Sequence, residues 1–175
     1  MNQKEDVKRR NEEIAQRFSK IEANLNAARS IPGVLETLLT EVEKEFRIPF
    51  VWLTFIEGED TRPLIEAALA SDFLKHRLNV VSSETFAGLL PDASRPVLVN
   101  RELRPFYRLL PASRKYFVKS LAVAPFVLNG RTAGSWNNGD ASGDRFAPDM
   151  ETGLIAALAC ALSRRLTELN TEKMR

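Results

Sequence analysis

The sequence is poor in the residues that most catalytic and metal sites need. Its 175 residues include one cysteine, Cys160, and one histidine, His76. A single cysteine excludes an internal disulfide, and one residue of each kind is too few for the usual zinc ligand sets. Neither a phosphate-binding Gly-x-x-x-x-Gly-Lys loop nor a dinucleotide-binding glycine pattern occurs. We therefore expect a non-enzyme with no catalytic residue, metal or cofactor, in which His76 is solvated and Cys160 is a small core residue.

The chain also lacks a long apolar run. No stretch approaches the roughly 20 apolar residues that span a bilayer. The charged start MNQKEDVKRRNEE has no apolar signal core. We therefore expect a cytoplasmic protein without membrane contact. The net charge of +2 does not by itself indicate a nucleic-acid partner. With 44% hydrophobic residues, the chain is long enough for one domain with a sizeable core.

Residues 3–28 contain neither proline nor glycine and predict an amphipathic helix. Its apolar residues form a narrow stripe with coiled-coil spacing, namely Val7, Ile14, Phe18, Ile21 and Leu25. Such a stripe packs either on its own domain or on a second chain, and its narrowness favours a second chain. We predict a homodimer through this stripe and the C-terminal helix. Residues 1–29 are accordingly a helical segment that precedes a domain at 30–175.

Residues 30–70 predict a helix followed by two strands. Ser30 is the expected N-cap of a helix that runs to about Arg47. Residues 50–56, FVWLTFI, are apolar on both faces, which is typical of a central strand. Leu64–Ala70 is predicted as a second strand. It would be antiparallel to the first, because the connection is too short for a crossover helix.

Short helices, one short strand and a hairpin are expected between residues 72 and 137. The short helices are predicted at 72–77, 84–90 and 104–110, and the short strand at 96–100. Ser120–Leu128 predicts a longer strand. Asn129 and Gly130 then form a tight turn into a returning strand at 131–137.

A final helix is expected to begin at Pro148 and to run to about residue 172. Its middle, Leu154–Leu162, is apolar almost all round, so we expect it to lie between two layers. After this segment the apolar stripe becomes narrower and has charged flanks.

The order of these elements resembles a GAF domain, the fold of many small-molecule sensors. The last third of the chain is also similar to the bacterial GAF-like family of unknown function numbered 484. The shared positions are Ser120, Leu121, Ala122, Pro125, Gly130, Gly134, Ser135, Asp144, Arg145, Phe146, Pro148 and Met150. The chain departs from the family at Arg131–Ala133 and at Trp136–Asn138, which predicts a short or bulged second hairpin strand.

The resemblance implies an α+β fold with an antiparallel sheet of about five to six strands. A layer of terminal helices would cover one face of the sheet, and short helices and loops would cover the other face. It also implies dimers formed by helices, and it assigns no activity, ligand or catalytic residue.

Residues 95–119 are basic and aromatic. The basic residues are Arg95, Arg101, Arg104, Arg108, Arg114, Lys115 and Lys119, against the single acid Glu102. The interleaved aromatic residues are Phe106, Tyr107, Tyr116 and Phe117. One interpretation is a lid over an anionic or aromatic small ligand. A nucleic-acid surface has the same ingredients, but we favour it less, and a solvated basic face with inward aromatics is the plainest alternative.

A ligand pocket is expected between the sheet and this segment. The predicted lining residues are Trp52, Phe86, Leu90, Arg104, Tyr107, Arg108 and Ser120. The functional hypothesis is a non-catalytic sensory or regulatory domain that dimerises through its terminal helices. The alternative is a dimerisation or scaffold protein that keeps the fold without a ligand.

Overall fold

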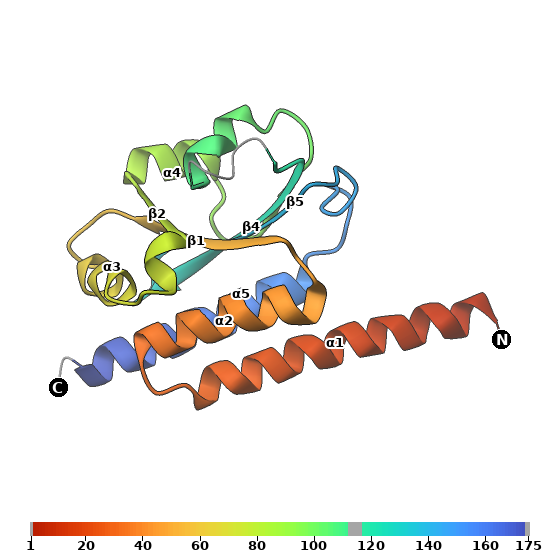
Figure 1. Cartoon of the computed structure of the whole chain (residues 1–175), viewed down its shortest axis with the longest axis horizontal. Coiled ribbons are helices and arrows are strands. Elements are labelled where there is room, and N and C mark those ends of the chain that lie inside the picture. Colours follow the sequence, from red (N-terminus) through yellow and green to blue (C-terminus); the bar gives the residue numbers. More distant parts are fainter. Residues whose placement is uncertain (1, 112–116, 174–175) are drawn as a thin grey trace.

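The computed structural model of the chain describes residues 2–111 and 117–173. A five-stranded sheet separates a layer of long helices from a layer of short helices and loops (Figure 1). The elements are α1 (Gln3–Ala27), α2 (Ile31–Phe46), β1 (Phe50–Ile56), α3 (Arg62–Leu69), η1 (Leu74–His76), β2 (Leu78–Val81), α4 (Ser83–Leu89), β3 (Val97–Val99), η2 (Arg104–Leu109), β4 (Ser120–Leu128), β5 (Arg131–Asp140) and α5 (Gly153–Lys173). The fold class predicted from the sequence is therefore confirmed, with five strands.

Helix α2 forms where local chemistry predicts it. The Ser30 hydroxyl accepts a hydrogen bond from the Gly33 N–H at 3.1 Å, which caps the first turn. Pro32 occupies that same turn, where its missing N–H costs nothing. The helix ends at Phe46, and Arg47 follows with a left-handed φ of 51°.

The strands lie in the order β2-β1-β5-β4-β3. The β1–β5, β5–β4 and β4–β3 pairs are antiparallel, whereas β1 and β2 are parallel, with Leu53 opposite Leu78. Strand β1 is next to the centre of the sheet, with both neighbours formed by later parts of the chain. Its apolar character on both faces follows from the layers above and below it.

The strand predicted at Leu64–Ala70 is wrong, because this segment is helix α3. Its sequence, LIEAALA, consists of residues with good helix propensity, and Pro63 lies in the first helical turn. The neighbour of β1 is instead β2, a short strand that the sequence pattern did not reveal. Helix α3 and the 3-10 helix η1 make the connection long enough for β2 to run parallel to β1.

The hairpin prediction is correct at its turn and wrong in the length of its second strand. Asn129 and Gly130 have φ values of 53° and 80°, as a tight two-residue hairpin requires. Strand β5 continues to Asp140, well past the expected end. The predicted bulge is present, because Phe126 pairs with Gly134 and the next residue, Val127, pairs with Thr132. The Val127 N–H donates to the Ser163 hydroxyl of α5 at 2.9 Å.

Helix α5 begins at Gly153, not at Pro148, and its apolar middle is not enclosed on all sides. Leu158 and Leu162 are buried, but Leu154 is 40% exposed and Cys160 is exposed as well. The interpretation of Cys160 as a core residue is therefore wrong. The sheet and the neighbouring helices cover one side of α5 and leave a second apolar side open.

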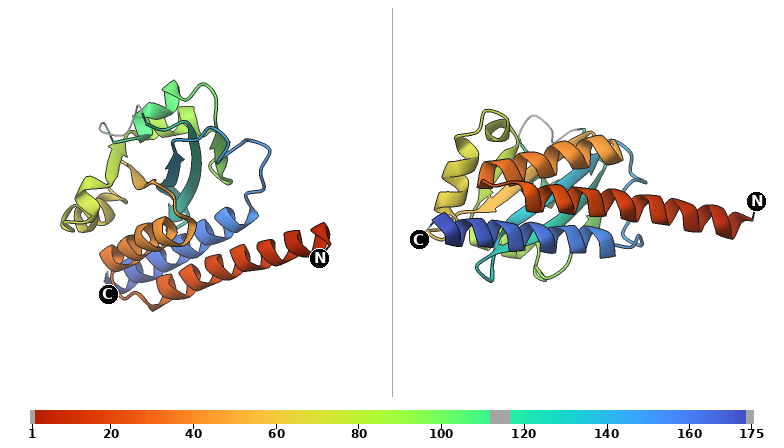
Figure 2. Two further views of the ribbon diagram at one scale, coloured as in Figure 1. Left: turned by 45° about the vertical axis from the view of Figure 1, so that its right-hand side comes forward. Right: turned by 90° about the horizontal axis from the view of Figure 1, so that it is seen from below.

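Helices α2 and α5 lie under the sheet, α1 lies beneath these two helices, and the first half of α1 extends past both (Figure 2). The second half of α1 belongs to the core of its own chain, because Ile21 and Leu25 are fully buried. These two residues are therefore not open to a second chain. Among residues 2–111 and 117–173, no helix is long and apolar enough to cross a membrane.

Candidate ligand site at the edge of the sheet

The aromatic and aliphatic residues predicted to line a pocket do come together, but as packed core. Trp52, Phe86 and Leu90 are buried in an apolar cluster on the face of the sheet opposite the long helices. Tyr107 is half-buried and packs against the same cluster. Their convergence was predictable from the fold, whereas an open cavity among them is not what the structure shows.

The polar residues of the predicted pocket lie elsewhere. Arg104 and Arg108 belong to η2 and are exposed to solvent. Ser120 lies on the other face of β4, where its hydroxyl donates to the Ser142 carbonyl at 2.7 Å and accepts from the Phe146 N–H. The structure therefore does not bring Ser120 together with Trp52. Arg114, Lys115 and Tyr116 of the basic segment lie outside the described residues.

A buried polar network holds η2 down on the sheet. The Leu109 carbonyl at the end of η2 accepts from Trp52 Nε1 at 2.7 Å and from Thr54 Oγ1 at 3.1 Å. Thr54 Oγ1 in turn accepts from Asn137 Nδ2 at 2.9 Å, and Asn137 Oδ1 accepts from Ser135 at 2.8 Å. Because these buried groups satisfy one another, the layer under η2 is closed.

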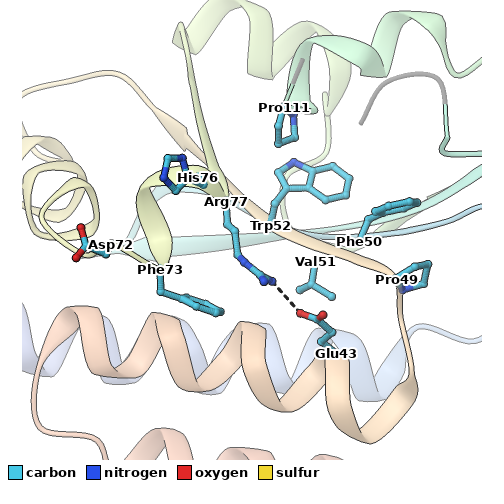
Figure 3. A pocket seen from close by; sticks show the side chains of 10 residues that line it. All are labelled: Glu43, Pro49, Phe50, Val51, Trp52, Asp72, Phe73, His76, Arg77 and Pro111. Atoms are coloured by element: carbon cyan, nitrogen blue, oxygen red, sulfur yellow. Dashed lines mark hydrogen bonds and ion pairs between the residues drawn. The ribbon is translucent and has the colours of Figure 1, made fainter. Parts of the chain in front are cut away.

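An open pocket of about 480 Å³ lies instead at the edge of the sheet (Figure 3). Its lining residues come from α2, β1, the η1 region and the end of the η2 segment. They are Glu43, Pro49, Phe50, Val51, Trp52, Asp72, Phe73, His76, Arg77 and Pro111. Of the residues predicted from the sequence, Trp52 alone lines this pocket. Its volume falls within the range of small-molecule sites.

The Arg77 guanidinium is fixed between an acid and an aromatic ring. Arg77 Nη1 lies 2.8 Å from Glu43 Oε2, and the guanidinium carbon lies 4.3 Å from the centre of the Phe73 ring. Figure 3 shows the Arg77 side chain running from the sheet edge down to Glu43, with Phe73 beside it. An ion pair and a cation–π contact together hold a flexible side chain in one place.

The edge of β1 has no strand partner at the pocket. The ladder with β2 begins at Leu53, whose N–H donates to the Arg77 carbonyl at 2.8 Å. The chain before β2 turns away as η1, so β2 does not continue alongside Val51. Since residues two apart in a strand present their backbone polar groups to the same side, Val51 faces the pocket.

His76 and Asp72 complete the pocket rim. His76 is exposed, as the sequence predicted, and Asp72 forms an ion pair with Lys75 at 2.9 Å. Within the described part of the chain, no group of three His, Cys, Asp or Glu side chains is placed to hold a metal ion. The pocket therefore offers ionic and hydrogen-bonding groups beside apolar surface.

The layered sheet and its helices define a GAF-like fold. Comparison with solved structures finds domains of similar fold, including three at low sequence identity. A GAF domain of a phosphoenolpyruvate-protein phosphotransferase from Coxiella burnetii has a TM-score of 0.64 and 15% identity, with 91% of this chain and 96% of that one covered. The corresponding GAF domain from Acinetobacter has a TM-score of 0.61 and 12% identity, with 89% and 93% covered.

A third similar structure is a domain of a putative two-component sensor histidine kinase protein from Sinorhizobium meliloti. It has a TM-score of 0.50 and 16% identity, and covers 81% of this chain and 94% of that one. No protein-family model and no curated protein matches the sequence. At these identities the neighbours establish the fold and leave activity and ligand to be argued from the residues.

Proposed function

We propose that this chain is a non-catalytic regulatory domain that forms a homodimer through α1 and α5 and takes a small ligand as its input. Within the GAF-like fold, the motif from Ser120 to Met150 relates it to the bacterial family of unknown function numbered 484. Three similar folds belong to a phosphotransferase or a sensor kinase protein, which supports a regulatory role. A domain without catalysis signals by shifting between arrangements or partners.

The observation that carries the dimer is the unpartnered first half of α1. Every residue from Asn2 to Glu13 is exposed, although the helix begins at Gln3. Helix α2 reaches α1 only from about Phe18, where the Phe18 and Phe46 rings lie 4.7 Å apart. Most helical stability in proteins comes from packing, and this extension of about three turns buries no residue against the described part of its own chain, so a second chain is its expected support.

Helix α5 also presents an exposed apolar surface. Leu154, Ala157 and Cys160 are exposed and lie three residues apart, on one face of the helix. Val7 of α1 is 57% exposed as well. A two-fold dimer would bury these positions from both copies and would leave Ile21 and Leu25 in their own cores.

Native mass spectrometry of the full chain tests the dimer. We expect a dimer for the natural sequence and a monomer for the Val7→Glu, Leu154→Glu double variant, because burial of the new charges is costly. Val80→Glu is the control, because Val80 is 38% exposed on β2, away from these helices. A natural chain that is monomeric at all concentrations, or a double variant that stays dimeric, contradicts this assembly.

A ligand-free scaffold is the second candidate. The observation in its favour is the closed layer under η2, where Trp52 and Thr54 donate to the Leu109 carbonyl and Asn137 donates to Thr54. A scaffold would dimerise in the same way and would show no change in thermal unfolding with any small molecule. Binding at the edge pocket separates the two candidates.

A further inference from the structure

We propose that the edge pocket binds a free α-amino acid with an apolar or aromatic side chain, as its zwitterion. This inference rests on the ligand clause of the proposed function and names the class of ligand. It follows from three features of the pocket: balanced charge, an unpaired strand edge and an apolar wall. Each feature matches a different part of the same molecule.

The charged groups of the pocket are balanced and only partly used. Arg77 has five N–H donors, of which Nη1 is paired with Glu43. One carboxylate oxygen of Glu43 accepts that bond, which leaves the other as an acceptor for an added donor. A ligand carboxylate can therefore add to the free side of the guanidinium, while a ligand ammonium is compensated by Glu43.

The unpaired strand edge adds a backbone donor and a backbone acceptor. Val51 presents its N–H and C=O toward the pocket, because β2 pairs with β1 only from Leu53 onward. The ammonium and carboxylate of an amino acid are separated by one carbon atom, a spacing close to that of a backbone N–H and C=O. Both ends of the zwitterion can therefore engage β1 and the Glu43–Arg77 pair together.

The remaining wall of the pocket is apolar. Pro49 and Phe50 lie on one side of Arg77, and Trp52 and Pro111 lie above them in Figure 3. The indole N–H of Trp52 is already donated to the Leu109 carbonyl, so that the ring contributes carbon surface. This wall suits the side chain of an apolar or aromatic amino acid.

A purely anionic or purely cationic ligand fits less well. An anion bound to Arg77 would lie close to the negative charge of Glu43 and be repelled by it. A cation bound to Glu43 would likewise be repelled by the positive charge of Arg77. The Asp72 carboxylate is already paired with Lys75. Only the zwitterion carries both a carboxylate for Arg77 and an ammonium for Glu43. It is therefore expected to bind more tightly than a ligand with only one of these groups.

Calorimetric titration of the full chain with three related probes tests this preference. The probes are L-phenylalanine, phenylacetate, which lacks the ammonium, and phenethylamine, which lacks the carboxylate. We expect L-phenylalanine to bind at least about tenfold more tightly than either analogue, because each loses a charged hydrogen bond. Equal affinity for phenylacetate, or absence of binding by L-phenylalanine at about 10 mM, where even a weak site would show binding, overturns the proposal.

Two variants assign the binding to this pocket. Arg77→Gln should weaken L-phenylalanine at least about tenfold. Glu43→Gln should weaken L-phenylalanine while it improves phenylacetate, because the competing carboxylate is removed. Arg95→Gln is the control, because Arg95 forms an exposed ion pair with Asp92 at 3.1 Å outside the pocket.

The outcomes separate this inference from the dimer. Circular dichroism establishes that each variant is folded, and if Arg77→Gln does not fold, Glu43→Gln and the three probes still decide the case. Unchanged probe preference in folded Glu43→Gln overturns the pocket assignment. Native mass spectrometry reads the dimer independently, so a dimer that binds no probe refutes the amino-acid site and leaves the assembly standing.

Discussion

The two faces of the sheet are covered by different kinds of structure, although the same strands supply both. Below the sheet, helices from both ends of the chain enclose a large apolar cluster that includes Leu38, Phe55 and Leu162. Above it, one continuous part of the chain encloses a smaller cluster and a buried polar network around Thr54. The lower face is thus built for packing, and the upper face for a fixed arrangement of polar groups.

The difference teaches that burial alone does not mark a ligand site. Trp52, Phe86 and Leu90 on the upper face are as buried as the core below, whereas the open pocket lies where the two layers meet at the edge of the sheet. That place is the β1 edge beside Arg77, where the chain turns away before β2. Function is therefore expected at the junction of the two layers.

The largest expected loss of stability comes from a substitution that disturbs the sheet itself and therefore both of its faces. A Cβ on Gly134 would lie 2.0 Å from the Thr54 carbonyl oxygen, which is backbone of the adjacent strand. Gly134→Ala should lower the free energy of unfolding by about 3 kcal/mol, because the two strands must separate. Gly88→Ala is the control, since nothing lies within 4 Å of its Cβ position and Gly88 lies in α4. Urea unfolding of both variants measures the difference, and equal stability of the two would contradict the close approach.

A smaller effect is confined to the upper face. Thr54→Val keeps the shape of the side chain but leaves Asn137 Nδ2 without its acceptor. We expect a loss of about 2 kcal/mol in the free energy of unfolding, because a buried donor becomes unpaired. Amide exchange should quicken in η2 before the helices below. Uniform quickening on both faces would show that the network does not act locally.

A matched pair of tryptophans compares the two faces directly. Trp52 Nε1 is bonded to Leu109 on the upper face, whereas Trp136 Nε1 on the lower face is buried without a hydrogen-bond partner in the described structure. Phenylalanine at either position removes similar volume. Trp52→Phe should therefore lower the free energy of unfolding by about 1 kcal/mol more than Trp136→Phe does, because only Trp52→Phe removes a hydrogen bond. Chemical unfolding of both variants tests the order, and a larger loss at Trp136 would contradict it.

The smallest expected effect is an ion pair that joins α1 and α2. Lys20 Nζ lies 2.8 Å from Glu45 Oε1 at the surface. This hydrogen bond lowers the pKa of Glu45 and raises the pKa of Lys20. The stability from Glu45 is present above the ordinary glutamate pKa and is lost as pH falls through the lowered value. The stability from Lys20 is present below the ordinary lysine pKa and is lost as pH rises through the raised value.

Thermal unfolding of Glu45→Gln beside the natural chain measures this pair. The variant should be slightly less stable at neutral pH, and the difference should vanish in acid and shrink in high salt. A difference that persists in acid would mean that the carboxylate charge is not its source.

Local chemistry explains why several elements could be predicted from the sequence. The Ser30 cap fixes the start of α2, and the Asn129-Gly130 turn fixes the ends of β4 and β5. Helix α3 was mistaken for a strand because its short apolar run fits either structure until helix propensity is weighed. Strand β2 has four residues and is only partly buried, so it gives almost no pattern.

The candidate site depends on long-range contacts that sequence spacing does not encode. Glu43 and Arg77 are 34 residues apart and meet only because α3 and η1 carry the chain across the edge of β1. The string Asp72–Arg77 looks like a solvated charged segment, and its Asp72, Lys75 and His76 are exposed. The signal that was missed is therefore the parallel crossover, which leaves Val51 without a partner in β2 and places Arg77 beside it.

Hydrogen exchange along α1 tests most directly whether a second chain completes the helical layer. The account predicts that amides of residues 3–13 become protected as protein concentration rises through dimer formation, while residues 21–27 are protected throughout. Protection of both parts independent of concentration, or rapid exchange of residues 3–13 in a proven dimer, would contradict the claim that α1 is an assembly element.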